Sequence, residues 1–241
     1  PIRRHDRADA GDQAFGADLG ERGQVEGQFA QPGPPAQEGA ASEGGTPGTY
    51  GDRYDAAYDL TVARGTADDF DRAAVAMELA KLPLHMLERL EDQGTQIVVV
   101  RNSVTEYRTD LQGVTPRGWP PGSSWDDVPG LYSPSTNEVM VATRGHGTSA
   151  GAHVPLMGDG HGSFSLALHE VGHGLDRGGR VSGSEAFAEA RAKDFNNLSA
   201  YEQQVGSAGA EETYAEVLGR YYGGDPTLEA EQPALFAFLQ A

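Results

Sequence analysis

The segment LALHEVGHGLD, residues 166–176, restricts the fold and chemistry of this chain more than any other stretch. His169 and His173 stand four residues apart, and Glu170 directly follows the first histidine. A helix places positions i and i+4 on one face, so both imidazoles can reach one metal ion. Glu170, one step around the helix, can reach a water molecule on that ion and act as a general base. The pattern therefore predicts a catalytic zinc site.

The residues around the motif also follow a helical period. An apolar stripe recurs at spacings i, i+4, i+7 and i+11, made of Phe164, Leu168, Val171 and Leu175. At roughly 100° per residue, the two histidines lie on the opposite side of the helix. We expect the helix to pack by its apolar face and to present the histidines from the other. The alternative is an amphipathic helix that carries two solvated histidines.

Composition limits the partners and the metal ligands. The chain has no cysteine, so a metal must be held by histidines and carboxylates. Its 36 acidic and 18 basic residues give a net charge of −18, which makes nucleic acid and anionic membrane surfaces poor partners. No apolar run approaches the roughly 18 residues of a membrane span.

The third metal ligand is open among four glutamates that follow the motif: Glu185, Glu189, Glu211 and Glu212. A catalytic zinc site takes three protein ligands and leaves a fourth position for water. On a helical wheel Glu212 shares a face with Glu216, which suits a ligand supported one turn later by a second carboxylate. The wheel favours Glu212 modestly over Glu189. For each glutamate the alternative is a solvated helix face.

The chain divides into two kinds of sequence. Residues 1–52 are rich in Gly, Pro and Ala and poor in large apolar side chains, so we expect a disordered linker. Residues 53–241 are expected to form one folded domain. Its predicted elements are a helix over 68–93 interrupted at Pro83, a strand over 95–100, a hairpin over 131–143, helices over 164–175, 184–196 and 210–222, and a last helix over 233–241.

Two loops carry aromatic and histidine side chains. We expect Trp119 and Trp125 to pack within an ordered loop, with a wall of the substrate site as the alternative. His146, His153 and His161 lie in a glycine-rich loop and are expected to be solvated. A second metal site is the alternative for these histidines.

Four motifs in this order resemble the zinc metallopeptidases of the anthrax lethal factor family, which include secreted Pro-Pro endopeptidases. GLYSPSTNEVMV (130–141) resembles the family's hairpin and strand, and HEVGHGLD (169–176) its metal-binding helix. NLSAY (197–201) resembles the segment that ends in a tyrosine, and EETYAEVLGRYY (211–222) the helix of the third ligand. The resemblance covers roughly residues 70–240.

The resemblance implies an α+β, zincin-like fold with a small mixed sheet, an active-site helix and C-terminal helices. It implies a Zn²⁺ ion on His169, His173 and Glu212, with Glu170 as the general base. Tyr201 is then the donor to the oxyanion, although it stands eleven residues before Glu212 where the family has seven. That difference implies a four-residue insertion around QQVGSAG, and the alternative is that Tyr201 merely packs.

Further residues gain roles from the same resemblance. Glu216 is expected to support the ligands from behind, and Asp176 falls on a family-like position after the helix. The strand that contains Val139, Met140 and Val141 is expected to pair with an extended substrate.

The expected function is zinc-dependent hydrolysis of a peptide bond in a protein or peptide substrate. One alternative is a non-catalytic, zinc-stabilised interaction domain, against which the intact Glu170 argues. The other is a zinc protease of another lineage with Glu185 or Glu189 as ligand. An acidic, cysteine-free module behind a Gly/Pro-rich linker suits a bacterial toxin or effector that is secreted or translocated into a target cell. A cognate inhibitor or immunity protein is then a partner to look for.

Overall fold

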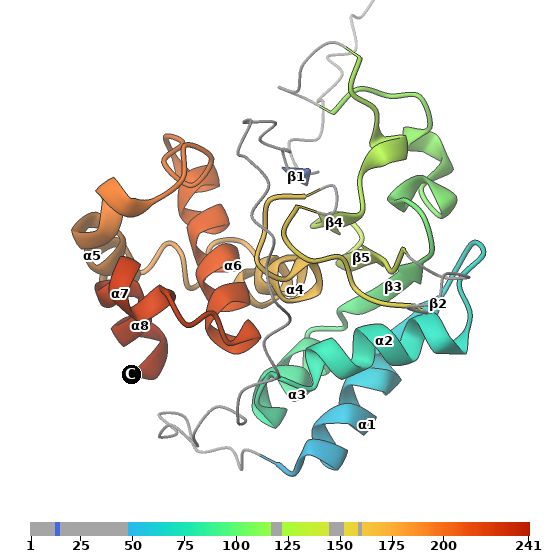
Figure 1. Ribbon diagram of the computed structural model, residues 1–241, viewed down its shortest axis with the longest axis horizontal. Coiled ribbons are helices and arrows are strands. Elements are labelled where there is room, and N and C mark those ends of the chain that lie inside the picture. The colour runs from blue at the N-terminus through green and yellow to red at the C-terminus, as the bar shows by residue number, and fades with distance from the viewer. Residues whose placement is uncertain (1–12, 15–47, 117–121, 145–151, 159–160) are drawn as a thin grey trace, which may run out of the picture.

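The computed structural model describes residues 13–14, 48–116, 122–144, 152–158 and 161–241 (Figure 1). Its helices and strands in chain order are β1 (Gln13–Ala14), α1 (Tyr50–Leu60), β2 (Thr61–Ala63), α2 (Asp69–Leu79), α3 (Leu84–Asp92), β3 (Gln96–Val100), β4 (Gly130–Ser133), β5 (Glu138–Ala142), α4 (Leu166–Asp176), α5 (Glu185–Asp194), α6 (Ser207–Gly223), α7 (Leu228–Glu231) and α8 (Pro233–Gln240). The small sheet with helices around it confirms the predicted α+β class. Within the described residues, no helix combines the length and apolar character that crossing a bilayer requires.

The sheet has the strand order β1-β4-β5-β3-β2. Strands β2, β3 and β5 are parallel, whereas β4 runs antiparallel to β5 and β1 antiparallel to β4. The hairpin of β4 and β5 confirms the predicted turn between them. Strand β5 is an interior strand of the sheet, paired on both sides. Strand β4 lies next to the edge, and only the two residues of β1 pair with its outer side.

The two faces of the sheet have separate cores, because successive side chains of a strand point to opposite faces. Ile97, Val99, Val139 and Val141 pack with the helices in the larger core. The other face buries Val98, Val100, Leu131 and Met140 together with Trp125. Trp125 thus packs as expected, whereas Trp119 lies outside the described residues.

The N-terminal helices differ from the expectation in three ways. The predicted helix over 68–93 is two helices, and Pro83 stands at the N-terminus of α3. The apolar residues that recur at helical spacing in 68–93 include Phe70 and Met77, yet these are 77% and 55% exposed; α2 instead buries Val75 and Leu79. Helix α1 was not predicted, because its sequence is largely polar. Its start is fixed by a reciprocal pair of hydrogen bonds between Thr49 and Asp52.

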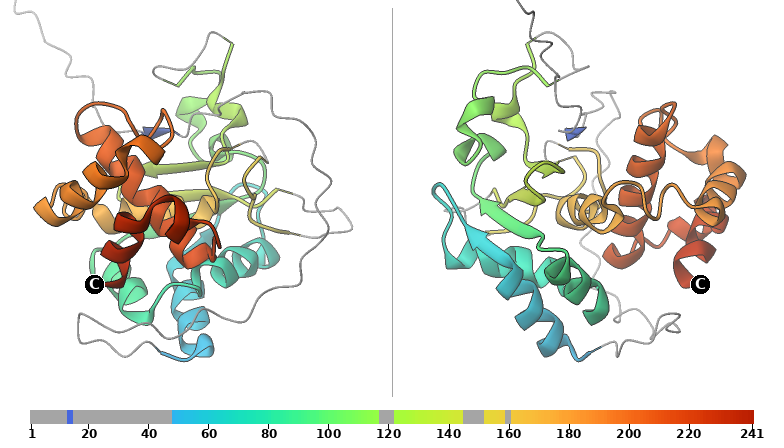
Figure 2. Two further views of the ribbon diagram at one scale, coloured as in Figure 1. Left: turned by 60° about the vertical axis from the view of Figure 1, so that its left-hand side comes forward. Right: turned by 180° about the vertical axis from the view of Figure 1, so that it is seen from behind.

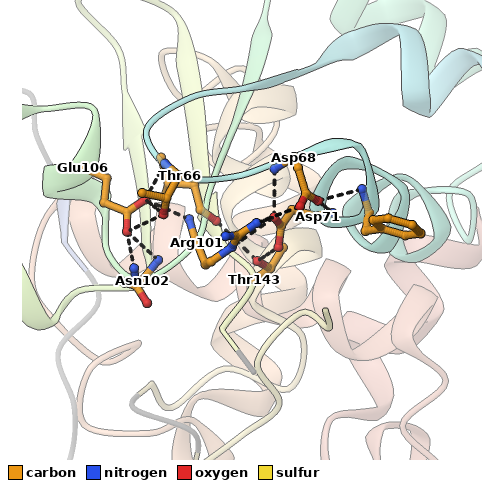
Figure 3. Close-up of polar contacts among 9 residues, drawn as sticks. Thr66, Asp68, Asp71, Arg101, Asn102, Glu106 and Thr143 are labelled. Carbon is orange, nitrogen blue, oxygen red and sulfur yellow. Dashed lines mark hydrogen bonds and ion pairs between the residues drawn. The ribbon is translucent and has the colours of Figure 1, made fainter. Parts of the chain in front are cut away.

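A polar cluster attaches α2 to the ends of the parallel strands (Figure 3). Arg101 directly follows β3, and its guanidinium bonds both Asp68 and Asp71 at the start of α2. Thr143 directly follows β5 and donates to the fully buried Asp71 at 2.6 Å. Burial would raise the pKa of Asp71, but the bonds from Thr143 and Arg101 outweigh burial and hold that pKa below its usual value. The ends of β3 and β5 are therefore tied to one helix.

Helix α4 lies between the sheet and α6, and Figure 2 shows it in the middle of the molecule. Every residue of α4 is buried, so the expectation that it packs by one face alone is wrong. The reason is that α6 covers the side that carries the histidines. The two helices meet closely: a Cβ placed on Gly172 would lie 2.8 Å from the Cα of Ala215.

This close approach predicts that alanine substitutions at two nearby glycines of α4 change the free energy of unfolding in opposite directions. In Gly172→Ala, the added methyl meets the backbone of α6, and we expect a loss of about 1–3 kcal/mol in the free energy of unfolding. In the control Gly174→Ala, the methyl meets its nearest atoms at 3.4 Å, and helix propensity favours alanine by up to about 1 kcal/mol. Urea unfolding measures both variants. Equal stabilities would contradict the packing described.

Candidate active site

Three buried side chains converge where α4 meets α6. His169 Nε2 lies 3.2 Å from His173 Nε2 and 3.3 Å from Glu212 Oε2, and the last two atoms are 3.4 Å apart. The side chains come from facing helices, since α4 carries both histidines and α6 carries the glutamate. Among the described residues, these three form a group whose ligand atoms are close enough to share a metal ion.

The triangle of donor atoms fits a zinc ion. Zinc bonds of about 2.0–2.1 Å at tetrahedral angles separate neighbouring ligand atoms by about 3.3–3.4 Å. The observed edges of 3.2, 3.3 and 3.4 Å match that separation. Glu212 Oε2 is also buried, and its polar neighbours among the described residues are the two imidazole nitrogens, which are themselves metal ligands; a bound cation would satisfy all three atoms. Two imidazoles and one carboxylate are a donor set that zinc prefers.

The other candidate glutamates lie elsewhere. Glu185 and Glu189 on α5 are exposed, and Glu211 is half-buried, whereas Glu212 is 3% exposed. The described group of ligand atoms includes none of the three. The structure therefore favours Glu212 over the rival ligands that the sequence left open.

Glu216 lies directly behind one histidine. Its Oε2 is 3.2 Å from His169 Nδ1, and its Oε1 accepts a hydrogen bond of 3.1 Å from the backbone N–H of Phe164. A carboxylate on Nδ1 holds the proton there, which leaves Nε2 free to bind a metal. Glu216 thus orients the imidazole from the side away from the ligand triangle.

Asp176 contacts a loop. Its carboxylate accepts from the N–H groups of Val181 and Ser182 at 2.7 and 2.9 Å and from the Ser182 hydroxyl at 2.6 Å. These bonds close the turn that follows α4. Asp176 can therefore influence the position of the metal ligands only indirectly, by fixing the C-terminal end of α4.

Glu170 is buried beside the triangle and under strand β4. It is 1% exposed, and burial raises its pKa to about 7 although the neighbouring imidazoles oppose the rise. The backbone of Tyr132 also lies near this carboxylate and opposes the rise in its pKa. A Cβ on Gly130 would lie 2.6 Å from Glu170 Oε1, so the strand can pass this close only with glycine there. A carboxyl group with a pKa near neutrality suits a general base.

Tyr201 reaches the site despite the longer connection to Glu212. Its hydroxyl donates to Glu212 Oε1 at 3.0 Å. Burial, the negative charge of Glu212 and this bond together raise the pKa of Tyr201 well above its usual value. The phenol therefore stays protonated and available as a donor.

Strand β5 cannot pair with a substrate, so the expectation for Val139, Met140 and Val141 is wrong. Its backbone is bonded to β3 on one side and β4 on the other, and all three side chains are fully buried. Of the two hairpin strands β4 is the outer one, and its residues Gly130 and Tyr132 were not among the predicted site residues. Tyr132 also stacks on His173, with ring centroids 6.4 Å apart.

The loop histidines take different positions. His161 is 4% exposed, so the expectation that it is solvated is wrong; His153 is half-buried. His146 lies outside the described residues. The described ligand groups include neither His153 nor His161, which leaves the second metal site without support.

Comparison with known families agrees with this geometry. The family described as anthrax toxin lethal factor, N- and C-terminal domain, matches residues 65–241. The chain belongs to this family. The resemblance inferred from the four motifs is thereby confirmed.

Two curated relatives carry the name Pro-Pro endopeptidase. The protein from Paenibacillus alvei is 31% identical over 189 residues, which span 75% of this chain and 81% of the relative. The protein from Clostridioides difficile strain 630 is 29% identical over 186 residues, or 73% and 77% of the two chains. The solved Pro-Pro endopeptidase of Paenibacillus alvei superimposes with a TM-score of 0.62 at 30% identity, covering 76% of this chain and 97% of that one. These relatives support a peptidase.

The charges around the triangle predict that metal binding releases protons. Burial alone would lower the pKa of His169, but contacts with the Glu212 and Glu216 carboxylates outweigh it and raise that pKa to about 10. The metal-free imidazole is then protonated at pH 7.5 and must become neutral to bind zinc. We expect about one proton released per zinc ion, measured by calorimetry in buffers of different ionisation enthalpy. Binding enthalpies that do not depend on the buffer would contradict this.

The close contact between β4 and Glu170 predicts that catalysis requires glycine at residue 130. In Gly130→Ala, the methyl displaces the Glu170 carboxylate or the strand, and we expect peptide cleavage to fall by at least about tenfold. Zinc content should stay at the wild-type value because the ligand triangle is untouched. Metal analysis and single-turnover kinetics test this pair of outcomes. Full activity in the variant would show that the contact does not position Glu170.

Proposed function

We propose that this protein is a zinc-dependent endopeptidase that hydrolyses a peptide bond with water. The observation that carries the proposal is the triangle of His169, His173 and Glu212 with the buried carboxylate of Glu170 beside it. When bound there, zinc supplies a Lewis acid that polarises a carbonyl and lowers the pKa of water to about 7. A purely structural zinc site has no use for an adjacent buried base.

The other steps of the reaction are assigned to side chains of this protein. Glu170 takes the proton of the attacking water on its carboxylate and then delivers it to the leaving nitrogen of the substrate. The Tyr201 hydroxyl donates to the oxygen that gains negative charge during attack. Glu216 keeps the His169 imidazole oriented throughout.

The outer edge of β4 is the place that we propose for the substrate. Gln13 and Ala14 of the chain itself pair there antiparallel with Tyr132 and Leu131, so this edge accepts an extended backbone. The same strand contacts Glu170 through Gly130 and Tyr132. A peptide bound in this way runs past the general base, and its main-chain hydrogen bonds set its direction.

We propose a bond between two prolines as the substrate, because both curated relatives are named for that specificity. We further propose that the protease acts as a secreted or translocated toxin or effector module. The net charge of −18, the absence of cysteine and the Gly/Pro-rich N-terminal sequence support that setting. A protein inhibitor that covers the edge of β4 would be its natural counterpart.

The test is cleavage of a peptide library enriched in Pro-Pro sequences by the zinc-loaded full chain and its Glu170→Gln variant. The variant retains the shape of the side chain and the zinc ligands but loses the base, so we expect zinc content near the wild-type value and a rate at least about 10²-fold lower. Glu189→Gln, which changes an exposed carboxylate, is the matched control and should cut normally. If the wild type holds one zinc ion and cuts no peptide, the zinc-stabilised interaction domain becomes the better account.

A further inference from the structure

The position of Tyr201 beside Glu212 requires contacts that hold its segment of the chain against α6. Glu212 follows Tyr201 by eleven positions in the sequence, and a connection of that length does not by itself fix where a side chain lies. The turn of residues 199–204 nevertheless places the Tyr201 hydroxyl 3.0 Å from Glu212 Oε1. Some interaction outside the turn must hold it against α6.

The turn is first stabilised by its own polar contacts. Glu202 is 5% exposed, and its carboxylate accepts from the N–H and hydroxyl of Ser199 at 2.9 and 2.7 Å. The amide of Gln203 donates to the carbonyl of Leu198 at 2.8 Å. All of these partners belong to the same short segment, so they shape the turn without attaching it to α6.

Arg191 on α5 makes the shorter contacts of that attachment, beside a longer one of 3.4 Å from the Thr213 hydroxyl on α6 to the Glu202 carbonyl. Its Nη2 donates to the backbone carbonyl of Glu202 at 2.5 Å, and its Nε donates to the hydroxyl of Thr213 at 2.9 Å. Glu202 is the residue after Tyr201, and Thr213 is the residue after Glu212. One guanidinium thus joins the neighbours of the two residues whose side chains meet in the site.

The surroundings of Arg191 fix this contact further. Its guanidinium carbon lies 5.2 Å from the centroid of the Phe195 ring, and the Thr213 hydroxyl donates in turn to the Gly209 carbonyl at 2.6 Å. At Gly209 the turn lies so close that a Cβ would be 2.7 Å from the carbonyl oxygen of Glu202. The planar guanidinium supplies two donors in a rigid arrangement, which a lysine ammonium cannot reproduce.

We propose that Arg191 is a positioning residue that holds the turn of residues 199–204, and with it Tyr201, in the active site. The proposal rests on the proposed peptidase function. Arg191 itself touches neither the ligand triangle nor the place of the substrate. Its effect on catalysis is expected to pass through the position of the Tyr201 hydroxyl, which the zinc content of the variants separates from an effect on Glu212.

A double-mutant cycle of Arg191→Ala and Tyr201→Phe in the zinc-loaded full chain tests this. Tyr201→Phe should lower kcat by about 10²-fold, the usual cost of one lost oxyanion donor. Arg191→Ala should lower kcat by about tenfold or more with zinc content unchanged, and it should cost nothing further in the Tyr201→Phe background. Arg191→Lys should restore part of the rate. Lys193→Ala, which removes an exposed charge two residues away, is the control and should keep full activity.

Equal losses from Arg191→Ala in both backgrounds, or no loss at all, would overturn the proposal. A second measurement does not depend on activity: hydrogen exchange of the amides in residues 199–206. We expect faster exchange there in Arg191→Ala than in Lys193→Ala, with unchanged exchange in α4. Unchanged exchange in 199–206 would overturn the attachment even if no peptide substrate were cut. Absent cleavage by the wild type, with faster exchange in the variant, would instead reject the peptidase function and keep the attachment.

Discussion

The close contact between α4 and α6 is the interaction on which the rest of the site depends. Each helix alone supplies an incomplete set of ligands, two imidazoles from one and a carboxylate from the other. Their atoms meet because Gly172 lets the backbone of α6 approach to a distance that no side chain would permit. Buried on all sides, α4 holds its histidines in a low-dielectric environment, where an unpaired Glu212 would be costly. Packing and metal chemistry therefore stabilise the same arrangement.

The sheet completes the site from the other side. Strand β4 lies against Glu170 at Gly130, where a Cβ would meet the carboxylate, so the backbone of the strand borders the proposed base directly. The polar cluster around Asp71 ties α2 to the ends of β3 and β5, and β5 is the strand that pairs with β4. The outer edge of β4, Glu170 and helix α4 are therefore parts of one packed unit.

The sequence predicts what depends on local spacing. Two histidines at i and i+4 with an intervening glutamate specify one helix face, and the strands of the hairpin follow from alternation and turn residues. Glu212 required more, since the helical wheel only ranked it among four glutamates and the family resemblance selected it. The tertiary contact with α4 is what brings it to the histidines.

Other features depend on tertiary contacts, which the local spacing of residues does not predict. From the sequence alone, either strand of the hairpin could be the outer one. The parallel pairing of β5 with β3 makes β5 the inner strand and β4 the outer one. Helix α1 was missed because its sequence is largely polar, and the exposure of Phe70 depends on which neighbours α2 meets. Tyr201 meets Glu212 from a turn that Arg191 contacts, and no motif indicates that arginine.

The central claim is that α4 and α6 together build a zinc site on His169, His173 and Glu212. X-ray absorption spectroscopy of the zinc-loaded chain tests it most directly, beside Glu212→Ala. The account predicts two imidazole nitrogens and carboxylate or water oxygens at about 2.0–2.1 Å, with weaker zinc binding and a changed coordination shell in the variant. A coordination shell that is identical in both proteins would contradict it.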